Sequence, residues 1–120
     1  MSIQMDLGMK AEAMAAKFLV NAGYIILEEN WRWDHAEVDL IAKDGETIVI
    51  VEVKARSSIK YGYPEEAVDK KKMHHLWRAS EAYVENKKLD CPVRFDIISI
   101  LFYDNQTRIR HIKDAFFPMD

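Results

Sequence analysis

The sequence of 120 residues contains few of the residues that cross-link, break or repeat a chain. It has a single cysteine, Cys91, which excludes an internal disulfide and is typical of proteins of the reducing cytoplasm. Only 4 Gly and 3 Pro are present, which excludes collagen-like and low-complexity sequences. No apolar run approaches the ~18 residues of a membrane span, and the first residues lack the pattern of a signal peptide. We therefore expect a cytoplasmic protein with no membrane partner.

Several signatures of catalytic and cofactor sites are also missing. The four histidines show no His-x-x-x-His spacing, which together with a single cysteine argues against a zinc site. No Gly-rich phosphate loop and no serine in a nucleophile elbow occur. What remains is a sequence with 49% hydrophobic and 31% charged residues, which is the composition of a globular protein. At this length we expect one domain spanning residues 1–120.

Charge is distributed unevenly along the chain. Residues 1–53 carry 4 Lys/Arg against 10 Asp/Glu, a net charge of -6, whereas residues 54–94 carry 10 against 6, a net charge of +4. The overall charge of -3 argues against a generic basic coat for nucleic acid. A basic middle segment could still meet phosphates while the acidic first half holds something else, although ordinary solvated surface explains the same pattern.

Hydrophobic periodicity predicts an α/β fold. Residues 7–23 show helical spacing and end at Gly23, and 24–27 form a short strand followed by a turn over 30–35. Two strands, 36–43 and 46–54, flank a turn at Asp44-Gly45. A helix over 65–88, a strand over 93–103 and a last strand over 108–113 follow. The order α-β-β-β-α-β, with a terminal strand, predicts helices over a mixed sheet.

One carboxylate stands where the pattern calls for an apolar side chain. Glu52 interrupts the run Ile48 to Val53, and a charge in a covered strand is costly unless it is paired or bound to a metal. A two-residue turn at Asp44-Gly45 pairs Asp39 with Ile50, which makes Asp39 the diagonal neighbour of Glu52. On this register four side chains emerge on one face: Glu37, Asp39, Glu52 and Lys54.

Two carboxylates about 5 Å apart repel each other by roughly 3 kcal/mol at an effective dielectric of about 20. Lys54 and a hard cation such as Mg²⁺ or Mn²⁺ would neutralise them. A metal held by two acids beside a lysine is a hydrolytic centre for phosphodiesters, in which the lysine orients the attacking water or stabilises charge. Cross-strand ion pairs at an exposed edge are the alternative.

Three further features touch this face. Lys72 lies on the apolar stripe of the second helix and points toward the sheet, either snorkelling or as a second cation for the acids or a phosphate. Glu12, one residue off the first helix's stripe, could reach the metal. Trp31 and Trp33 alternate around Arg32 and could stack unpaired bases, although such aromatics more often pack against a sheet or an interface.

The sequence resembles the YraN-like family of small bacterial proteins, for which an endonuclease activity has been suggested. The resemblance runs nearly end to end. It is carried by Gly8, Ala11-Glu12, Gly23-Tyr24, Asn30-Trp31-Arg32, Glu37-Val38-Asp39-Leu40-Ile41, Val51-Glu52-Val53-Lys54-Ala55-Arg56, the Lys72 region and Arg94-Phe95-Asp96. Ala36 departs from the glycine usual at its position, which limits a close backbone approach there.

That family is similar to the PD-(D/E)XK restriction-endonuclease-like nucleases, which implies an αβββαβ core and a Mg²⁺- or Mn²⁺-dependent endonuclease acting on DNA. It implies that Asp39 and Glu52 bind the metal and that Lys54 completes the motif. Glu12 corresponds to the helical acid of archaeal Holliday-junction resolvases, which implies branched DNA and a homodimer. Glu37 matches the family pattern without a settled role. We expect phosphate contacts from three basic residues: Arg56, Lys72 and Arg32.

The same fold is shared by proteins that only bind. A non-catalytic DNA-binding or adaptor module that keeps these acids is therefore the alternative to the nuclease, and a structural protein without affinity for DNA is a second one. Salt-dependent binding separates these two alternatives. The sequence does not specify whether the substrate is duplex, single-stranded, flapped or branched DNA.

Overall fold

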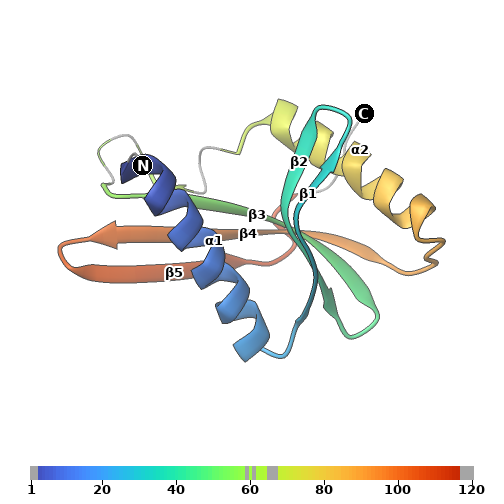
Figure 1. Ribbon diagram of the computed structural model, residues 1–120, viewed down its shortest axis with the longest axis horizontal. Coiled ribbons are helices and arrows are strands. Elements are labelled where there is room, and N and C mark those ends of the chain that lie inside the picture. Colours follow the sequence, from blue (N-terminus) through green and yellow to red (C-terminus); the bar gives the residue numbers. More distant parts are fainter. Residues whose placement is uncertain (1–2, 59, 61, 65–67, 117–120) are drawn as a thin grey trace.

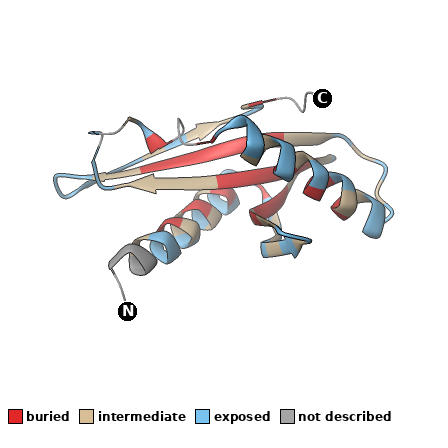
Figure 2. Cartoon of the chain, turned by 90° about the horizontal axis from the view of Figure 1, so that it is seen from above, coloured by how far each residue is buried: buried red, intermediate tan, exposed pale blue. Residues whose placement is uncertain are grey.

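The computed structural model describes residues 3–58, 60, 62–64 and 68–116. A five-stranded sheet in the order β1-β2-β3-β4-β5 forms its centre. Helices α1 and α2 cover opposite faces of this sheet (Figures 1 and 2). The element order is αβββαβ followed by one further strand, so the predicted mixed α/β class and nuclease-like core order are confirmed. No helix in the described ranges combines the length and apolarity that a membrane crossing requires.

Helix α1 (Ile3–Asn21) packs one face against the sheet. Ala11, Ala15 and Leu19 recur at steps of four and are fully buried, because residues four apart lie on the same side of a helix. The helix ends at Asn21, two residues before the predicted end at Gly23. The φ of Gly23 is +95°, which costs little only for glycine. Tyr24 N then donates to Leu19 O at 2.9 Å, so the chain turns back toward the sheet.

Strand β1 (Ile25–Trp33) is longer than the sequence predicts. The predicted turn over 30–35 is confirmed only at 34–35, because Trp31 and Trp33 pair with Val38 and Ala36 of β2. Asn30 lies within this strand with a φ of +52°, a conformation that asparagine tolerates better than most residues. A single left-handed asparagine therefore gives the segment the sequence signature of a turn without ending the strand.

Strands β2 (Ala36–Asp44) and β3 (Thr47–Arg56) form the predicted antiparallel hairpin. The predicted register is wrong by two residues, since Asp44 pairs with Thr47 and the turn consists of Gly45 and Glu46. Gly45 has a φ of +60°, which fits the first central position of a type II′ turn. A shift of two residues preserves which side chains share a face of the sheet.

Helix α2 (Lys70–Asn86) connects β3 to β4 (Val93–Tyr103), which runs parallel to β3. Residues 65–67 of the predicted helix 65–88 lie outside the described residues. Within the described residues, α2 begins after Asp69, so residues 68 and 69 are not helical as predicted. The side chain of Asp69 accepts a hydrogen bond of 2.9 Å from Lys72 N and is the N-cap. Leu76, Ala79 and Tyr83 are buried against the sheet.

Strand β5 (Gln106–Ile112) completes the sheet next to β4. Because α1 and α2 lie on opposite faces, the sheet separates two hydrophobic clusters. Leu19 and Val51 belong to the cluster under α1, whereas Leu76 and Ile50 belong to the cluster under α2. Strand β3 contributes to both clusters through alternate side chains, which explains its nearly continuous β-branched sequence.

Candidate active site

The candidate site lies where β2 leaves β3. Backbone pairing between these strands ends at Leu40 and Val51, and beyond this point the β1–β2 hairpin diverges from β3 (Figure 1). Val53 N donates a hydrogen bond of 2.8 Å to Asp39 Oδ2. The carboxylate of Asp39 therefore provides the acceptor that the backbone of β2 no longer offers, and this bond holds Asp39 at the fork.

Glu52 is the second acid at the fork, one residue beyond the last residue of β3 that pairs with β2. Its relative exposure is 2%. Burial, a hydrogen bond with Asp39 and the charge of Asp39 raise the pKa of Glu52 to about 8. The predicted proximity of the two acids is therefore observed, although the register of the strands differs by two residues from the predicted one. In the metal-free protein, burial beside Asp39 favours the protonated form of Glu52 at neutral pH.

Two lysines flank this acid pair from different elements. Lys72 Nζ on α2 lies 3.3 Å from Glu52 Oε2, so the lysine on the apolar stripe points to the sheet as predicted. The contact lacks hydrogen-bond geometry, and Glu52 Oε2 is buried without a hydrogen-bond partner among the described residues. The charges of Lys72 and Lys54 both lower the pKa of Glu52, but less than burial and Asp39 raise it.

On the other face of the sheet, Glu12 approaches Asp39 from α1. Burial and then the charge of Asp39 raise the pKa of Glu12. The amide Nδ2 of Asn30, oriented to satisfy both neighbours, donates 3.1 Å hydrogen bonds to Glu12 Oε2 and Glu37 Oε1. Asn30 thus joins α1 to the β1–β2 hairpin. Sequence reasoning gave Asn30 no role at the site, and its only signal was an asparagine inside an otherwise strand-forming segment.

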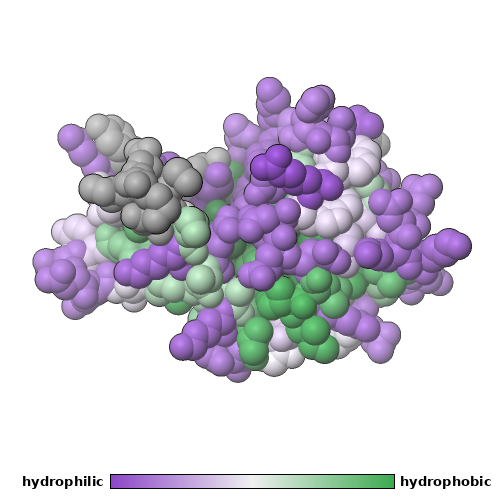
Figure 3. All heavy atoms as spheres, in the orientation of Figure 1, coloured by the Kyte–Doolittle hydropathy of each residue, from purple (hydrophilic) through white to green (hydrophobic). Residues whose placement is uncertain are grey.

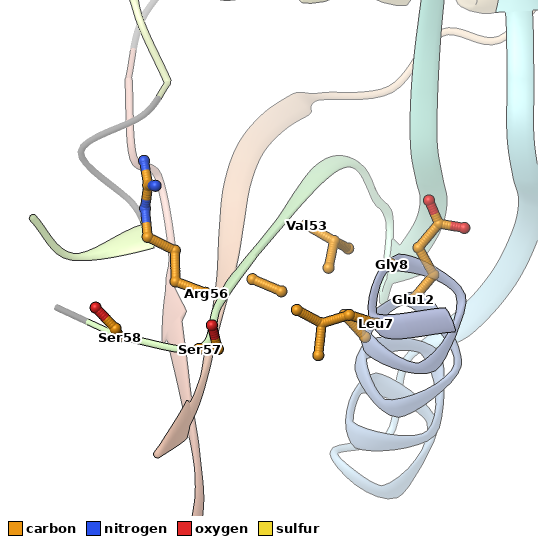
Figure 4. A pocket seen from close by; sticks show the side chains of 9 residues that line it. Leu7, Gly8, Glu12, Val53, Arg56, Ser57 and Ser58 are labelled. Carbon is orange, nitrogen blue, oxygen red and sulfur yellow. The ribbon is translucent and has the colours of Figure 1, made fainter. Parts of the chain in front are cut away.

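A pocket of about 460 Å³ opens beside Glu12, between α1 and the end of β3. Figure 4 shows Glu12 and Arg56 on opposite walls, with Leu7 and Val53 between them. Arg56 Nε is buried and has no hydrogen-bond partner among the described residues. Arg56, Ser57 and Ser58 line the same pocket, so donors suited to a phosphate oxygen stand next to the acids.

Arg32, the third predicted phosphate contact, lies on β1. It is exposed and pairs with Glu37, with Nη2 and Oε2 3.2 Å apart. The residues that the fold brings together around the fork are Glu12, Glu37, Asp39, Glu52, Lys54 and Lys72, with Arg56 across the neighbouring pocket.

The donor chemistry at the fork suits a hard divalent cation. Asp39 and Glu52 supply carboxylate oxygens, which Mg²⁺ and Mn²⁺ prefer, and the buried Glu52 Oε2 lacks a hydrogen bond. Among the described residues, no three His, Cys, Asp or Glu side chains are arranged as a complete metal site. The residues therefore fit a cation held by two carboxylates, with water or substrate oxygens in the other positions, as is usual for Mg²⁺.

Comparison with known proteins places these residues in a wider group. The family described as "Uncharacterised protein family UPF0102" matches residues 11–100. A UPF0102 protein of Bacteroides thetaiotaomicron is 44% identical over 113 residues, covering 94% of this chain and 93% of that protein. One from Christiangramia forsetii is 46% identical over 112 residues, covering 93% and 94%. One from Thermodesulfovibrio yellowstonii is 44% identical over 114 residues, covering 95% and 98%.

Proposed function

We propose that this chain, which belongs to the uncharacterised protein family UPF0102, is a metal-dependent endonuclease that hydrolyses phosphodiester bonds of DNA. The observation that carries the proposal is the pairing of the half-buried Asp39 with the buried Glu52. A fold gains nothing from placing two acids in mutual contact, because each raises the cost of ionising the other. A divalent cation accounts for the pair, since it replaces the proton on Glu52 and makes both charges favourable.

In this proposal Asp39 and Glu52 hold Mg²⁺ or Mn²⁺, and Glu12 contacts the metal or a water bound to it. The bound ion would activate water and screen phosphate charge. The hydrogen bond from Val53 N keeps Asp39 in place before any ligand arrives, so little ordering remains to be done on binding. Asn30 orients Glu12 through its 3.1 Å hydrogen bond.

Lys54 orients the attacking water and stabilises negative charge at the phosphate. It follows Glu52 by two residues on the same strand, and its charge reaches the Glu52 carboxyl. The water oxygen forms a bond to phosphorus and releases a proton to solvent, while the bond from phosphorus to the leaving sugar oxygen breaks and the leaving oxygen takes up a proton from solvent. Arg56 binds a phosphate next to the cleaved bond from the wall of the neighbouring pocket.

Lys72 has a separate role in this account. Its Nζ lies 3.3 Å from Glu52 Oε2, so its charge partly neutralises the acid pair while the metal is absent. If a cation binds the two carboxylates, the ammonium of Lys72 would no longer be needed there and would contact the substrate phosphate. Because 35% of the Lys72 side chain is exposed, it reaches a phosphate without a rearrangement of α2.

One observation favours a second function, a DNA-binding module without catalysis. Two carboxylates rather than a complete set of three ligands meet at the fork in the described part of the chain. A protein that kept the fold after losing cleavage would look the same in this respect. It would bind DNA but leave it intact in every divalent metal.

Cleavage of labelled DNA separates the two functions. Duplex, single-stranded, splayed and four-way DNA are incubated with the purified protein in Mg²⁺ or Mn²⁺, and the strands are resolved on denaturing gels. We expect cleavage of at least one substrate, and its loss in E52Q, which keeps the shape of Glu52 without its charge. E81Q is the matched control, because Glu81 is exposed on α2. Cleavage that persists in purified E52Q refutes the assignment.

A further inference from the structure

A second pocket, here called the hairpin pocket, lies between the tip of the β1–β2 hairpin and α2. It encloses about 390 Å³, within the size range of small-ligand sites. Six of its lining residues carry the argument: Trp33, Ala36, Lys71, His74, His75 and Arg78. None of them belongs to the acid site, and two of its walls come from elements that also carry that site.

The hairpin pocket has an aromatic wall and a cationic rim. Trp33 is half-buried, whereas Lys71, His74, His75 and Arg78 are all exposed. Helix α2 has no acidic residue before Glu81, and hydrophilic side chains cover this part of the molecule (Figure 3). The acid in the pocket is Asp34, whose Oδ1 lies 3.7 Å from His35 Nε2. The rim therefore attracts anions, and phosphate is the anion that a DNA strand carries.

Trp31 and Trp33 both pack against the hydrophobic cluster under α2, but Trp33 also lines the hairpin pocket. Trp31 packs edge-on against Tyr83, with ring centroids 5.2 Å apart. Trp33 instead has the guanidinium of Arg78 over its ring at 6.0 Å, the outer limit of a cation–π contact. Because Arg78 is exposed, it does not fix that face, and an aromatic ring next to arginine is the arrangement that stacks nucleobases.

The hairpin pocket adjoins the acid site through both of its walls. Ala36 precedes Asp39 by three residues on β2, which is about 10 Å of strand. Lys71 is next to Lys72, whose ammonium contacts Glu52. A DNA strand with one nucleotide in the hairpin pocket would therefore pass the acid pair within a few nucleotides.

We propose that the hairpin pocket binds an unpaired nucleotide, with its base on Trp33 and its phosphate on Lys71, His74 and Arg78. This inference rests on the proposed function and specifies its substrate class as DNA with a single-stranded or splayed segment beside the cleaved bond. A duplex presents phosphates on a convex surface and keeps its bases stacked on each other, so its bases do not enter a concave aromatic pocket. Stacking on Trp33 therefore separates unpaired from paired DNA.

Binding measured without cleavage tests this inference. The fluorescence anisotropy of a labelled oligothymidylate strand and of a blunt duplex of the same length is followed at low salt in EDTA. We expect W33L and R78A each to weaken binding of the single strand about five-fold or more, with little change for the duplex. Y103L and R108A are the matched controls, because Tyr103 and Arg108 line a smaller pocket at the other end of the molecule.

The remaining outcomes are decisive against the inference. Unchanged single-strand affinity in W33L and R78A overturns it, as does an equal loss for both kinds of DNA or no binding by the unmodified protein. R78A removes an exposed side chain, so it gives an answer even where W33L fails to fold by circular dichroism. Failure of the proposed function looks different: Trp33-dependent binding remains, but no metal supports cleavage.

Discussion

Val53 N donates a 2.8 Å hydrogen bond to Asp39 Oδ2 at the point where β2 leaves β3. This bond connects the fold to the candidate chemistry, because an acid is fixed where the ladder of backbone hydrogen bonds stops. An exposed aspartate at a strand end would move freely and would repel Glu52 less. The backbone of β3 instead holds Asp39 beside the buried carboxyl of Glu52.

Substitutions of Asp39 separate its structural and chemical roles. D39A leaves the N–H of Val53 without its partner, so we expect a loss of stability of roughly 1–3 kcal/mol. D39N keeps a carbonyl acceptor, so its stability stays close to that of the unmodified protein. Chemical denaturation measures the difference, and both variants should lose cleavage. Equal stability of D39A and D39N would show that the bond to Val53 contributes nothing.

The raised pKa of Glu52 makes the stability of the metal-free protein depend on pH. Its pKa of about 8 lies above the ordinary value of 4.5, so the folded protein holds a proton that the unfolded chain releases. This contribution is complete below pH 4.5 and is lost as pH rises from 4.5 to about 8. We expect a loss on the order of a few kcal/mol over this window, measured by urea denaturation in EDTA.

The variant E52Q isolates this effect from other titrating groups. Glutamine cannot ionise, so the pH-dependent loss that Glu52 causes should disappear, whereas E81Q should behave as the unmodified protein. Glu12, whose pKa burial also raises, contributes a loss of the same sign that remains in E52Q. Identical pH profiles for E52Q and the unmodified protein would contradict a buried, protonated Glu52.

Sequence patterns predicted the features that depend on local chemistry. The hairpin of β2 and β3 follows from its β-branched runs, and the anomaly of Glu52 follows from a charge inside one of them. The predicted register of β2 against β3 was wrong by two residues because Asp44 belongs to β2 rather than to the turn. In the strand, its Oδ2 lies 3.1 Å from Arg94 Nη1. That partner lies 50 residues away in the sequence, so no local rule places it.

Other features depend on contacts between distant elements, which one sequence does not reveal. Asn30 indicates a turn locally, yet it lies inside β1 and joins two acids from different elements. The turn residues themselves, Gly45 and Glu46, depend on that same tertiary pairing. At the fork, the Asp39 side chain replaces a backbone acceptor because β2 diverges from β3. The pattern of apolar residues in the sequence does not predict where two strands diverge.

Asn30 has two separable roles, in backbone conformation and in side-chain bonding. N30A should lose stability of roughly 1–2 kcal/mol, because a non-glycine side chain resists the φ of +52°. N30G accepts this φ and should be more stable than N30A. Both lose the bridge between Glu12 and Glu37, so both should cleave more slowly by the same gel assay. Full activity of N30G would show that the bridge does not position Glu12.

A buried ionic network at the far end of the sheet should matter for stability alone. Asp96 is fully buried, and Arg94 bonds it through Nε and Nη2, each at 2.9 Å. R94A leaves this carboxylate inadequately paired, so we expect a loss of roughly 3–5 kcal/mol by chemical denaturation. R108A, which removes an exposed arginine, should change little. A loss for R94A no larger than that for R108A would contradict this role.

The same network predicts sensitivity to acid. Burial alone would raise the pKa of Asp96, but hydrogen bonds from His111 and Arg94 outweigh it and hold the pKa below its ordinary value. The stabilisation is therefore present above the ordinary pKa of aspartate and is lost as pH falls through the lower pKa of the folded protein. D96N should flatten the acid limb of the stability profile, and an unchanged limb would contradict the network's contribution.

Calorimetric titration of Mn²⁺ into the purified protein at pH 8, beside D39N, tests the metal site at the fork most directly. Because the pKa of Glu52 is about 8, its carboxyl is about half ionised at this pH, so protonation competes with the metal less than at neutral pH. We predict one site with heat of binding in the unmodified protein and none in D39N, either alone or with a non-hydrolysable DNA strand that completes the coordination. Equal binding by D39N, or no binding by the unmodified protein even with that DNA, would contradict the account.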